Sequence, residues 1–370
     1  MKHLFYLVFS LALFSAQAQT NASFTHNGVN RTFVYYTPSA WNASTEMPLM
    51  IVMHGLTQTG NGLMNITDFN AIAEANNFIV CYPDGLNNAW NANMNLTVST
   101  ADDLGFIETL ATYFQTNFNT NPLKQYLVGF SNGGFMSHKI ACESSMCFAA
   151  IATVAGNMSD TTYANCNPQF SPAVLHIHGT ADLVVPYNGG TGSGVSVDLT
   201  MEKWRLFLNC NANPNIVDMP NTNLFDMSSP QRIIYSNCAS PLELIKITGG
   251  GHQWPGISTL IGGAGTINMD FYSPQVIWDF LSGKSCPPPA EIDENVEEAW
   301  KLYPNPVNDF LLLNFAQEAY FDIRDLQGKQ VLSGNYSNPI PVAQLSQGVY
   351  VLRITTEKKS HFLRFVKGSF

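Results

Sequence analysis

Unbroken runs of apolar residues occur at residues 48–53, 78–82 and 126–130, and the largely apolar segments 149–154 and 173–178 are further strand candidates. Because such a run has no polar side, we predict strands that are buried on both faces, as in parallel sheets. Residues 32–36 and 243–248 are further strand candidates.

Segments with helical character separate these strands. We predict helices over residues 67–76, 101–118, 201–208 and 274–281, and another directly after residue 131. Thr100 is the expected N-cap of the second helix, and Asp103 lies in its first turn, where a negative charge suits the helix dipole. Alternating strands and helices predict one mostly parallel sheet, with an active site at the carboxyl ends of its strands.

The pattern changes near residue 283. Residues 285–300 are first proline-rich and then acidic, which is typical of a linker. From residue 301 onward, short segments of alternating apolar and polar residues follow, such as 319–323 and 349–354. They predict a small all-β, sandwich-like domain over residues 301–370, after a larger α/β domain over residues 19–284.

The first 18 residues have the features of a signal peptide. Lys2 precedes an apolar run from Leu4 to Phe14, and Ala16-Gln17-Ala18 forms a small-x-small cleavage site. The run is too short to span a bilayer, and the rest of the chain offers no transmembrane candidate. We therefore predict an exported protein, in which disulfides can form.

Charged residues are scarce and mostly acidic. They make up 12% of the chain, against about 25% in an average soluble domain. The formal net charge is −10, which argues against a nucleic acid as partner.

Seven cysteines follow the predicted cleavage site. Cys210 and Cys238 bracket a stretch with little regular pattern, and a bond between them would close a loop worth about 3 kcal/mol in the chain-entropy model. Cys142 and Cys147 lie close together around a predicted helix end and are a second candidate pair. Cys81 lies within an apolar run, which favours a buried free thiol. The absence of a Cys-x-x-Cys motif disfavours a zinc site.

The most informative stretch is Gly129-Phe130-Ser131-Asn132-Gly133, which lies between a predicted strand and a predicted helix. This arrangement predicts a tight turn that holds Ser131 in a strained conformation at a helix N-terminus. Glycines are needed at 129 and 133 because a Cβ there would collide with the neighbouring strand or helix. Ser131 is therefore the candidate nucleophile.

A serine nucleophile needs a base and an orienting carboxylate. His252 follows three glycines at the end of a predicted strand, and Asp182 lies just beyond another predicted strand end. The order nucleophile, acid, base is that of α/β-hydrolases. In that fold the oxyanion hole takes one N–H from the residue after the nucleophile, here Asn132, and one from an earlier loop, here Leu56.

Six motifs support this interpretation by resemblance. They lie in order at residues 48–55, 82–85, 102–106, 129–134, 178–187 and 250–256. Over residues 22–284 the chain resembles the secreted serine esterases that include polyhydroxybutyrate depolymerases and feruloyl or acetylxylan esterases. The resemblance implies the triad Ser131, Asp182 and His252, and a cysteine near each of positions 210 and 238. It also implies substrate contacts by His54, Trp90, Asn91 and Trp254.

The last seventy residues resemble the type A sorting domain of the Por (type IX) secretion system. The motifs lie at residues 302–307, 345–350 and 362–367. The resemblance implies export through that machinery to the extracellular space or the cell surface. A carbohydrate-binding accessory module is the alternative, and the basic C-terminal end, including Lys367, favours the sorting domain.

Together these features predict a secreted serine carboxylic-ester hydrolase that needs no cofactor. His176 and His178 share one face of a predicted strand, but no third ligand has suitable spacing, so we predict no metal site. The expected substrate is a polymeric ester, either polyhydroxybutyrate or feruloyl or acetyl esters of plant polysaccharide. A non-catalytic surface-binding or adhesion protein that keeps the hydrolase fold is the alternative hypothesis, and the complete triad argues against it.

Overall fold

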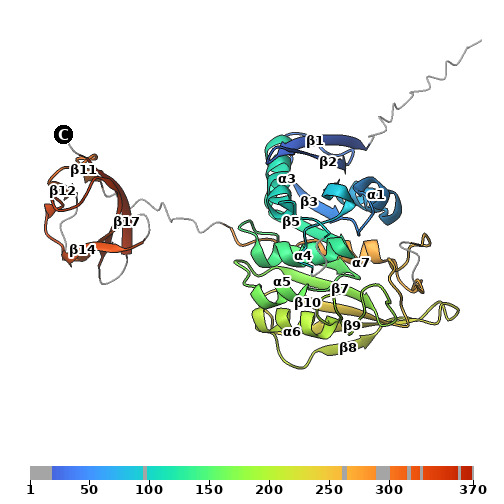
Figure 1. Cartoon of the computed structure of the whole chain (residues 1–370). Coiled ribbons are helices and arrows are strands. Elements are labelled where there is room, and N and C mark those ends of the chain that lie inside the picture. Colours follow the sequence, from blue (N-terminus) through green and yellow to red (C-terminus); the bar gives the residue numbers. More distant parts are fainter. Residues whose placement is uncertain are drawn as a thin grey trace, which may run out of the picture. The chain divides into compact units, whose positions relative to one another are not determined.

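A computed structural model describes residues 19–94, 98–260, 265–288, 301–314, 318–325, 328–356 and 360–368. The chain divides into two compact units, Met1–Pro288 and Pro289–Phe370 (Figure 1). The predicted signal peptide, residues 1–18, and residues 289–300 of the predicted linker lie outside the described residues.

The first unit is built on one mixed sheet. Within its described residues the strand order is β1-β2-β4-β3-β5-β6-β7-β10-β9-β8. The strands are β1 Thr20–His26, β2 Val29–Tyr36, β3 Met47–Met53, β4 Ile79–Pro83, β5 Thr120–Phe130, β6 Ala150–Val154, β7 Ala173–Gly179, β8 Asn215–Asp218, β9 Ser229–Tyr235 and β10 Leu242–Thr248. The strands from β4 to β10 pair in parallel, and antiparallel pairs flank them at both edges.

Helices cover both faces of this sheet (Figure 1). They are α1 Gly60–Thr67, α2 Phe69–Asn76, α3 Asp103–Phe118, α4 Asn132–Glu143, α5 Asp160–Asn165, α6 Val197–Phe207 and α7 Ser273–Leu281, with a 3-10 turn at Leu86–Asn88. Alternate residues of β3 enter different cores, Ile51 with α3, α4 and α6, and Val52 with α1, α2 and α7. The predicted α/β-hydrolase architecture is therefore confirmed, since its central strands are buried on both faces.

Local differences from the predicted elements have identifiable causes. The helix expected over residues 67–76 is two helices, because Asp68 adopts a left-handed conformation with φ 55° between them. The N-cap of α3 is Asp102 rather than Thr100, since the Asp102 carboxylate accepts a hydrogen bond from the Gly105 N–H. The stretch between Cys210 and Cys238 holds β8, an exposed edge strand, and β9, a mostly half-buried strand, so little apolar pattern is left to detect.

Three disulfides join segments of the first unit. They link Cys142 to Cys166, Cys147 to Cys286 and Cys210 to Cys238, and Cys81 is a buried thiol. The expected Cys142–Cys147 pairing is wrong, because these two side chains enter the cores on opposite faces of the sheet. Cys286, which the sequence placed in the linker, belongs instead to the first unit.

The second unit contains two antiparallel sheets, with orders β11-β12-β15 and β14-β13-β16-β17 among its described residues. The strands are β11 Leu302–Tyr303, β12 Phe310–Leu313, β13 Tyr320–Arg324, β14 Gln330–Asn335, β15 Ile340–Pro341, β16 Gly348–Thr355 and β17 Ser360–Lys367. Leu311, Ile323 and Leu352 from the two sheets share one core. This arrangement is the sandwich-like domain predicted from the alternating pattern.

Candidate active site

Ser131 lies at the junction between β5 and α4, as the N-cap of the helix. Its backbone has φ 52° and ψ −120°, an unusual conformation for a residue other than glycine. A Cβ on Gly129 would lie 2.1 Å from the carbonyl oxygen of Gly133, and a Cβ on Gly133 would lie 2.2 Å from that of Met53. The close approach of α4 to β5 and β3 therefore requires both glycines, and it holds the strained turn in place.

His252 lies within hydrogen-bond distance of Ser131. Its Nε2 is 3.0 Å from Ser131 Oγ, and its Nδ1 is 2.7 Å from Asp182 Oδ2. The loop that carries His252 approaches the end of β7 so closely that a Cβ on Gly179 would lie 2.2 Å from the carbonyl oxygen of Gly250. The ring of Phe130 packs beside the imidazole, with 5.0 Å between centroids.

The Asp182 carboxylate is fixed by its own turn. Oδ1 accepts hydrogen bonds from the backbone N–H groups of Val184 at 2.8 Å and Val185 at 2.7 Å. These two bonds leave Oδ2 directed at His252. Because the side chain is buried, the carboxylate interacts with His252 in a site that excludes most water.

The turn after β3 lies next to Ser131. A Cβ on Gly55 would lie 3.3 Å from the Cβ of Ser131, and the turn is closed by a hydrogen bond from Gln58 N to the Gly55 carbonyl. Leu56 is at the tip of this turn, with its side chain 44% exposed. Asn132 is the first residue of α4, so its N–H is at the positive end of the helix dipole.

Of the four residues expected to contact substrate, His54, Trp90 and Trp254 are buried, and Trp90 also lines the hollow described below. His54 Nε2 accepts a hydrogen bond from Gly85 N, so its Nδ1 carries the proton and donates to the Gly55 carbonyl at 2.7 Å. Burial lowers the pKa of His54, which keeps the imidazole neutral. These contacts give His54 a structural role in supporting the Leu56 turn, and its substrate contact stays a prediction.

The two tryptophans also have structural contacts. Trp90 donates from Nε1 to the His54 carbonyl, and its backbone N–H donates to Asn132 Oδ1. Trp254 packs against the rings of Phe69 and Phe130. Both rings therefore have structural contacts around Ser131, and their substrate contacts stay a prediction.

Asn91 is half-buried and lines a hollow of the first unit. Other residues that line the hollow are Trp90, Ala92, Asn93, Met94, Val98, Ser99 and Thr161. The Asn91 backbone donates to Asp103 Oδ2, and its carbonyl accepts from Lys139 Nζ, each at 2.7 Å. Asp103 also pairs with Arg31 at 2.6 Å in the interior, so its role extends beyond the helix dipole. No local pattern in the sequence indicated that Lys139 would reach this loop.

The matches to known proteins fall into two parts of the chain. Residues 25–173 match the family model described as "Putative esterase", and residues 301–367 match the secretion system C-terminal sorting domain. The first unit belongs to the esterase family. The second unit is a sorting domain, which indicates a secreted or cell-surface protein and implies the secretion machinery as a partner. No helix among the described residues has the length and apolar character that a membrane span requires.

Individual relatives of this esterase are distant. Feruloyl esterase C of Emericella nidulans is 25% identical over 270 residues, which cover 69% of this chain and 86% of the relative. The bifunctional acetylxylan esterase/xylanase XynS20E of Neocallimastix patriciarum is 24% identical over 69% of this chain and 33% of the relative. The solved acetyl xylan esterase from Aspergillus awamori superposes with a TM-score of 0.52 and 16% identity, covering 71% of this chain and 98% of that chain. This superposition supports the shared fold.

Proposed function

We propose that the first unit is a serine carboxylic-ester hydrolase in which Ser131, His252 and Asp182 form the catalytic triad. One observation carries this proposal: the continuous path from Ser131 Oγ through both imidazole nitrogens of His252 to Asp182 Oδ2. These contacts give a nucleophile, a base within reach of its proton, and a carboxylate that orients the base.

The reaction follows from these contacts. His252 Nε2 takes the hydroxyl proton of Ser131 as Oγ bonds to the ester carbonyl carbon, and the backbone N–H groups of Leu56 and Asn132 stabilise the oxyanion. His252 then returns the proton to the departing alcohol, which leaves an acyl-enzyme. A water molecule, deprotonated by the same imidazole, cleaves the acyl-enzyme and regenerates Ser131. Asp182 stabilises the imidazolium in both stages.

The proposed substrates are feruloyl or acetyl esters of plant polysaccharide. The side chains of Asn91, Asn93 and Thr161 give the hollow several groups that can hydrogen-bond to sugar hydroxyls. The names of the feruloyl and acetylxylan esterase relatives agree with this substrate class.

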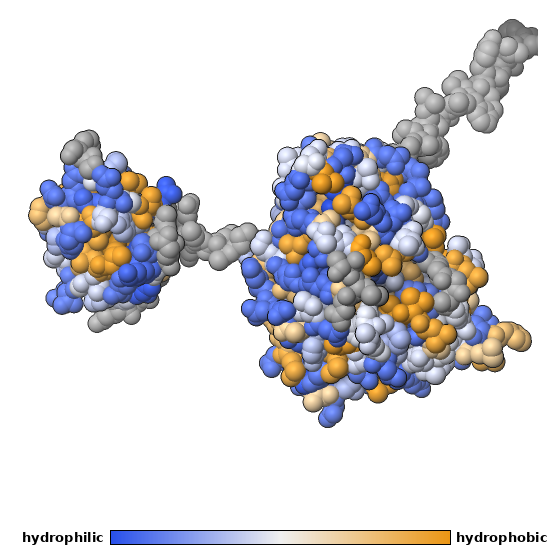
Figure 2. Space-filling model, in the orientation of Figure 1, coloured by the Kyte–Doolittle hydropathy of each residue, from blue (hydrophilic) through white to orange (hydrophobic). Residues whose placement is uncertain are grey.

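A second candidate substrate is an aliphatic polyester such as polyhydroxybutyrate. The segment between β8 and β9 projects from the unit (Figure 1) and carries the exposed side chains of Leu224, Phe225 and Met227. Figure 2 shows apolar colouring on this projection and in patches across the same face. Leu183, directly after Asp182, is also 85% exposed. Apolar side chains in such positions can adsorb to a hydrophobic polymer surface.

The test is an activity panel with p-nitrophenyl acetate, methyl ferulate, acetylated xylan and polyhydroxybutyrate particles. Ser131→Ala should lower kcat by a factor on the order of 10³ or more on every substrate that the wild type cleaves. Ser137→Ala is the matched control, because Ser137 is a buried serine of the same helix whose Oγ donates to the Gly133 carbonyl. Wild-type turnover by a folded Ser131→Ala enzyme would remove the nucleophile assignment, and an inactive wild type would favour the binding-protein alternative.

A further inference from the structure

Three buried histidines lie behind Asp182, on the face of the sheet that α4 and α6 cover. His138 is on α4, His176 and His178 are on β7, and each is at most 1% exposed. Thr153 of β6 lies between the first two, with its Oγ1 3.4 Å from His138 Nε2 and 2.7 Å from His176 Nδ1. His176 Nε2 is 3.1 Å from His178 Nδ1. The four side chains form a continuous row of hydrogen bonds.

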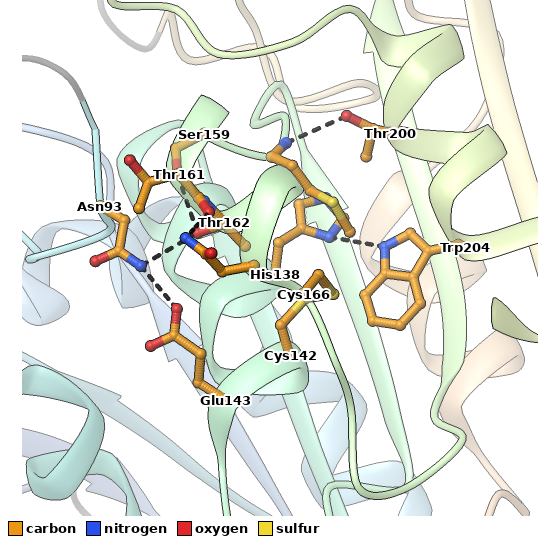
Figure 3. The surroundings of a disulfide bond; sticks show 12 residues. Asn93, His138, Cys142, Glu143, Ser159, Thr161, Thr162, Cys166, Thr200 and Trp204 are labelled. Carbon is orange, nitrogen blue, oxygen red and sulfur yellow. Dashed lines mark hydrogen bonds between the residues drawn. A yellow bond between two sulfur atoms is a disulfide. The ribbon is translucent and has the colours of Figure 1, made fainter. Parts of the chain in front are cut away.

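One end of this row is fixed by a group that can only donate. The indole Nε1–H of Trp204, on α6, donates to His138 Nδ1 at 3.1 Å (Figure 3). His138 therefore carries its proton on Nε2, which faces Thr153. Figure 3 also shows His138 beside the Cys142–Cys166 disulfide, which joins the end of α4 to the segment after α5. This disulfide ties down the helix that carries both Ser131 and His138.

The other end is fixed by a group that can only accept. His178 Nε2 donates to the backbone carbonyl of Val185 at 2.8 Å. A neutral His178 then has a bare Nδ1, so His176 must donate to it from Nε2. His176 Nδ1 is in turn bare and accepts from the hydroxyl of Thr153. The two ends thus determine a single tautomer, Nε2–H, for all three histidines and a single direction for the row.

Burial keeps these imidazoles neutral. It lowers the pKa of His138 to about 3 and that of His178 to about 4, and it lowers the pKa of His176 well below the ordinary value. A proton added to His178 Nδ1 would face the Nε2–H of His176, so the row exists only in the neutral state.

The row ends at the proposed catalytic carboxylate. His178 Nε2 is 3.5 Å from Asp182 Oδ2, the oxygen that also contacts His252. Val185 is held twice, since its N–H donates to Asp182 Oδ1 and its carbonyl accepts from His178. The turn that aims Asp182 at His252 is therefore anchored to the interior of the sheet through His178.

We propose that His178, held in its Nε2–H tautomer by the Val185 carbonyl on one side and by the His176 Nε2–H on the other, is a positioning residue for Asp182. This role rests on the proposed function of Ser131, Asp182 and His252. His178 touches no reacting atom. Its Nε2–H holds the Val185 carbonyl and adds a donor beside Asp182 Oδ2, which keeps that oxygen aligned with His252 Nδ1.

Two amide substitutions test the roles of the two ring nitrogens of His178 one at a time. The amide nitrogen of His178→Gln can occupy the place of Nε2 and still donate to Val185. The amide of His178→Asn reaches only the place of Nδ1, so it can accept from His176 but cannot donate to Val185 or Asp182. With p-nitrophenyl acetate we expect His178→Asn to lower kcat about 10- to 100-fold, as a small misplacement of a catalytic group does, with KM nearly unchanged. His178→Gln should retain most of the wild-type kcat.

Trp204→Phe controls for lost stability. It removes the donor at the far end of the row, so the melting temperature should fall while kcat stays at the wild-type value, because the Thr153 hydroxyl can still donate to His176. Equal kcat values for the Gln and Asn variants would overturn the positioning role, as would a Trp204→Phe enzyme as slow as His178→Asn. A wild type that cleaves no ester would overturn the proposed function and the positioning role together.

The tautomers of the row can also be measured directly, without an activity assay. In the wild-type protein labelled with ¹⁵N-histidine, NMR spectra should show the neutral Nε2–H tautomer at positions 138, 176 and 178. An Nδ1–H tautomer or a charged imidazole at position 176 or 178 at neutral pH would overturn the inference, even if every variant failed to fold.

Discussion

Ser131 combines a strained backbone with the first turn of a helix. A left-handed φ at a residue other than glycine costs about 1–3 kcal/mol, so the surrounding structure must enforce it. Here the backbone N–H of Ser131 donates to the Val154 carbonyl, and its own carbonyl accepts from Gly134 and Phe135. These bonds impose the strained backbone conformation of Ser131. They also hold the residue at the start of α4, with its Oγ within reach of His252.

At this scale the proposed oxyanion donor can be tested at Leu56. Leu56→Pro removes the backbone N–H and should lower kcat by about 10²–10³, the usual effect of losing one such donor. Leu56→Ala keeps the N–H and trims a half-exposed side chain, so it should leave kcat unchanged. The measurement is kcat on p-nitrophenyl acetate together with a melting curve. A folded Leu56→Pro enzyme with normal kcat would show that another group stabilises the oxyanion.

The contact between α4 and the sheet depends on small residues. Gly129 and Gly133 let the helix begin directly against β5 and β3, and Gly134 approaches Gly156 after β6, where a Cβ would lie 3.0 Å from its Cα. Since α4 carries Ser131 and Asn132 at its start, the position of this helix sets the distance between Ser131 and His252.

Gly133→Ala should therefore displace the helix. The new Cβ would overlap the Met53 carbonyl, a backbone group that cannot move aside without moving β3. We expect the free energy of unfolding to fall by about 3 kcal/mol or more, at the upper end for overpacked cores. Gly190→Ala is the control, because a Cβ there meets nothing within 4 Å. Urea unfolding curves with similar midpoints for both variants would contradict the packing argument.

The two units have separate cores, and the first extends to Pro288. Cys286 bonds to Cys147, and its backbone N–H donates to the Leu123 carbonyl, so the esterase unit needs residues beyond 284. The proposed catalytic residues all come from this unit.

A truncated chain of residues 19–288 should fold and cleave p-nitrophenyl acetate with the kcat/KM of the full chain. The physical reason is that each unit buries its own apolar residues. Circular dichroism and the esterase assay check this expectation. If the truncated chain were folded but inactive, the sorting domain would have to contribute to the site.

The buried histidines make the stability of the esterase unit depend on pH. Burial lowers the pKa of His138 to about 3 and that of His178 to about 4, and it lowers the pKa of His176 as well. Between pH 7 and pH 5 the unfolded chain binds protons at these sites and the folded chain does not, so the free energy of unfolding falls as pH falls.

Each of the three should contribute a loss of about 2 kcal/mol over that interval, from an unfolded pKa near 6.5. Urea unfolding of the truncated chain at several pH values measures the total. His138→Phe removes one titrating group and should reduce the loss between pH 7 and pH 5 by about 2 kcal/mol. An unchanged slope in that variant would show that His138 is protonated in the folded state.

The sequence by itself determined the two-domain organisation, the esterase and sorting families, and most strands of the parallel sheet. It also singled out Ser131, Asp182 and His252, and the structure places His252 within hydrogen-bond distance of both of the others. These features depend on spacing between neighbouring residues, such as unbroken apolar runs and glycines at fixed offsets, and such spacing is visible along the chain.

Only the tertiary structure decided which side chains meet across the sheet. Cys142 and Cys147 are five positions apart but enter opposite cores, so their disulfide partners come from distant segments. Burial of Trp90 and Trp254 likewise depends on how their segments pack onto the rest of the unit. The row from Trp204 to His178 depends on which face of a strand or helix each of its residues occupies. Contacts between segments far apart in the chain leave no local pattern, because they arise only when the helices pack onto the sheet.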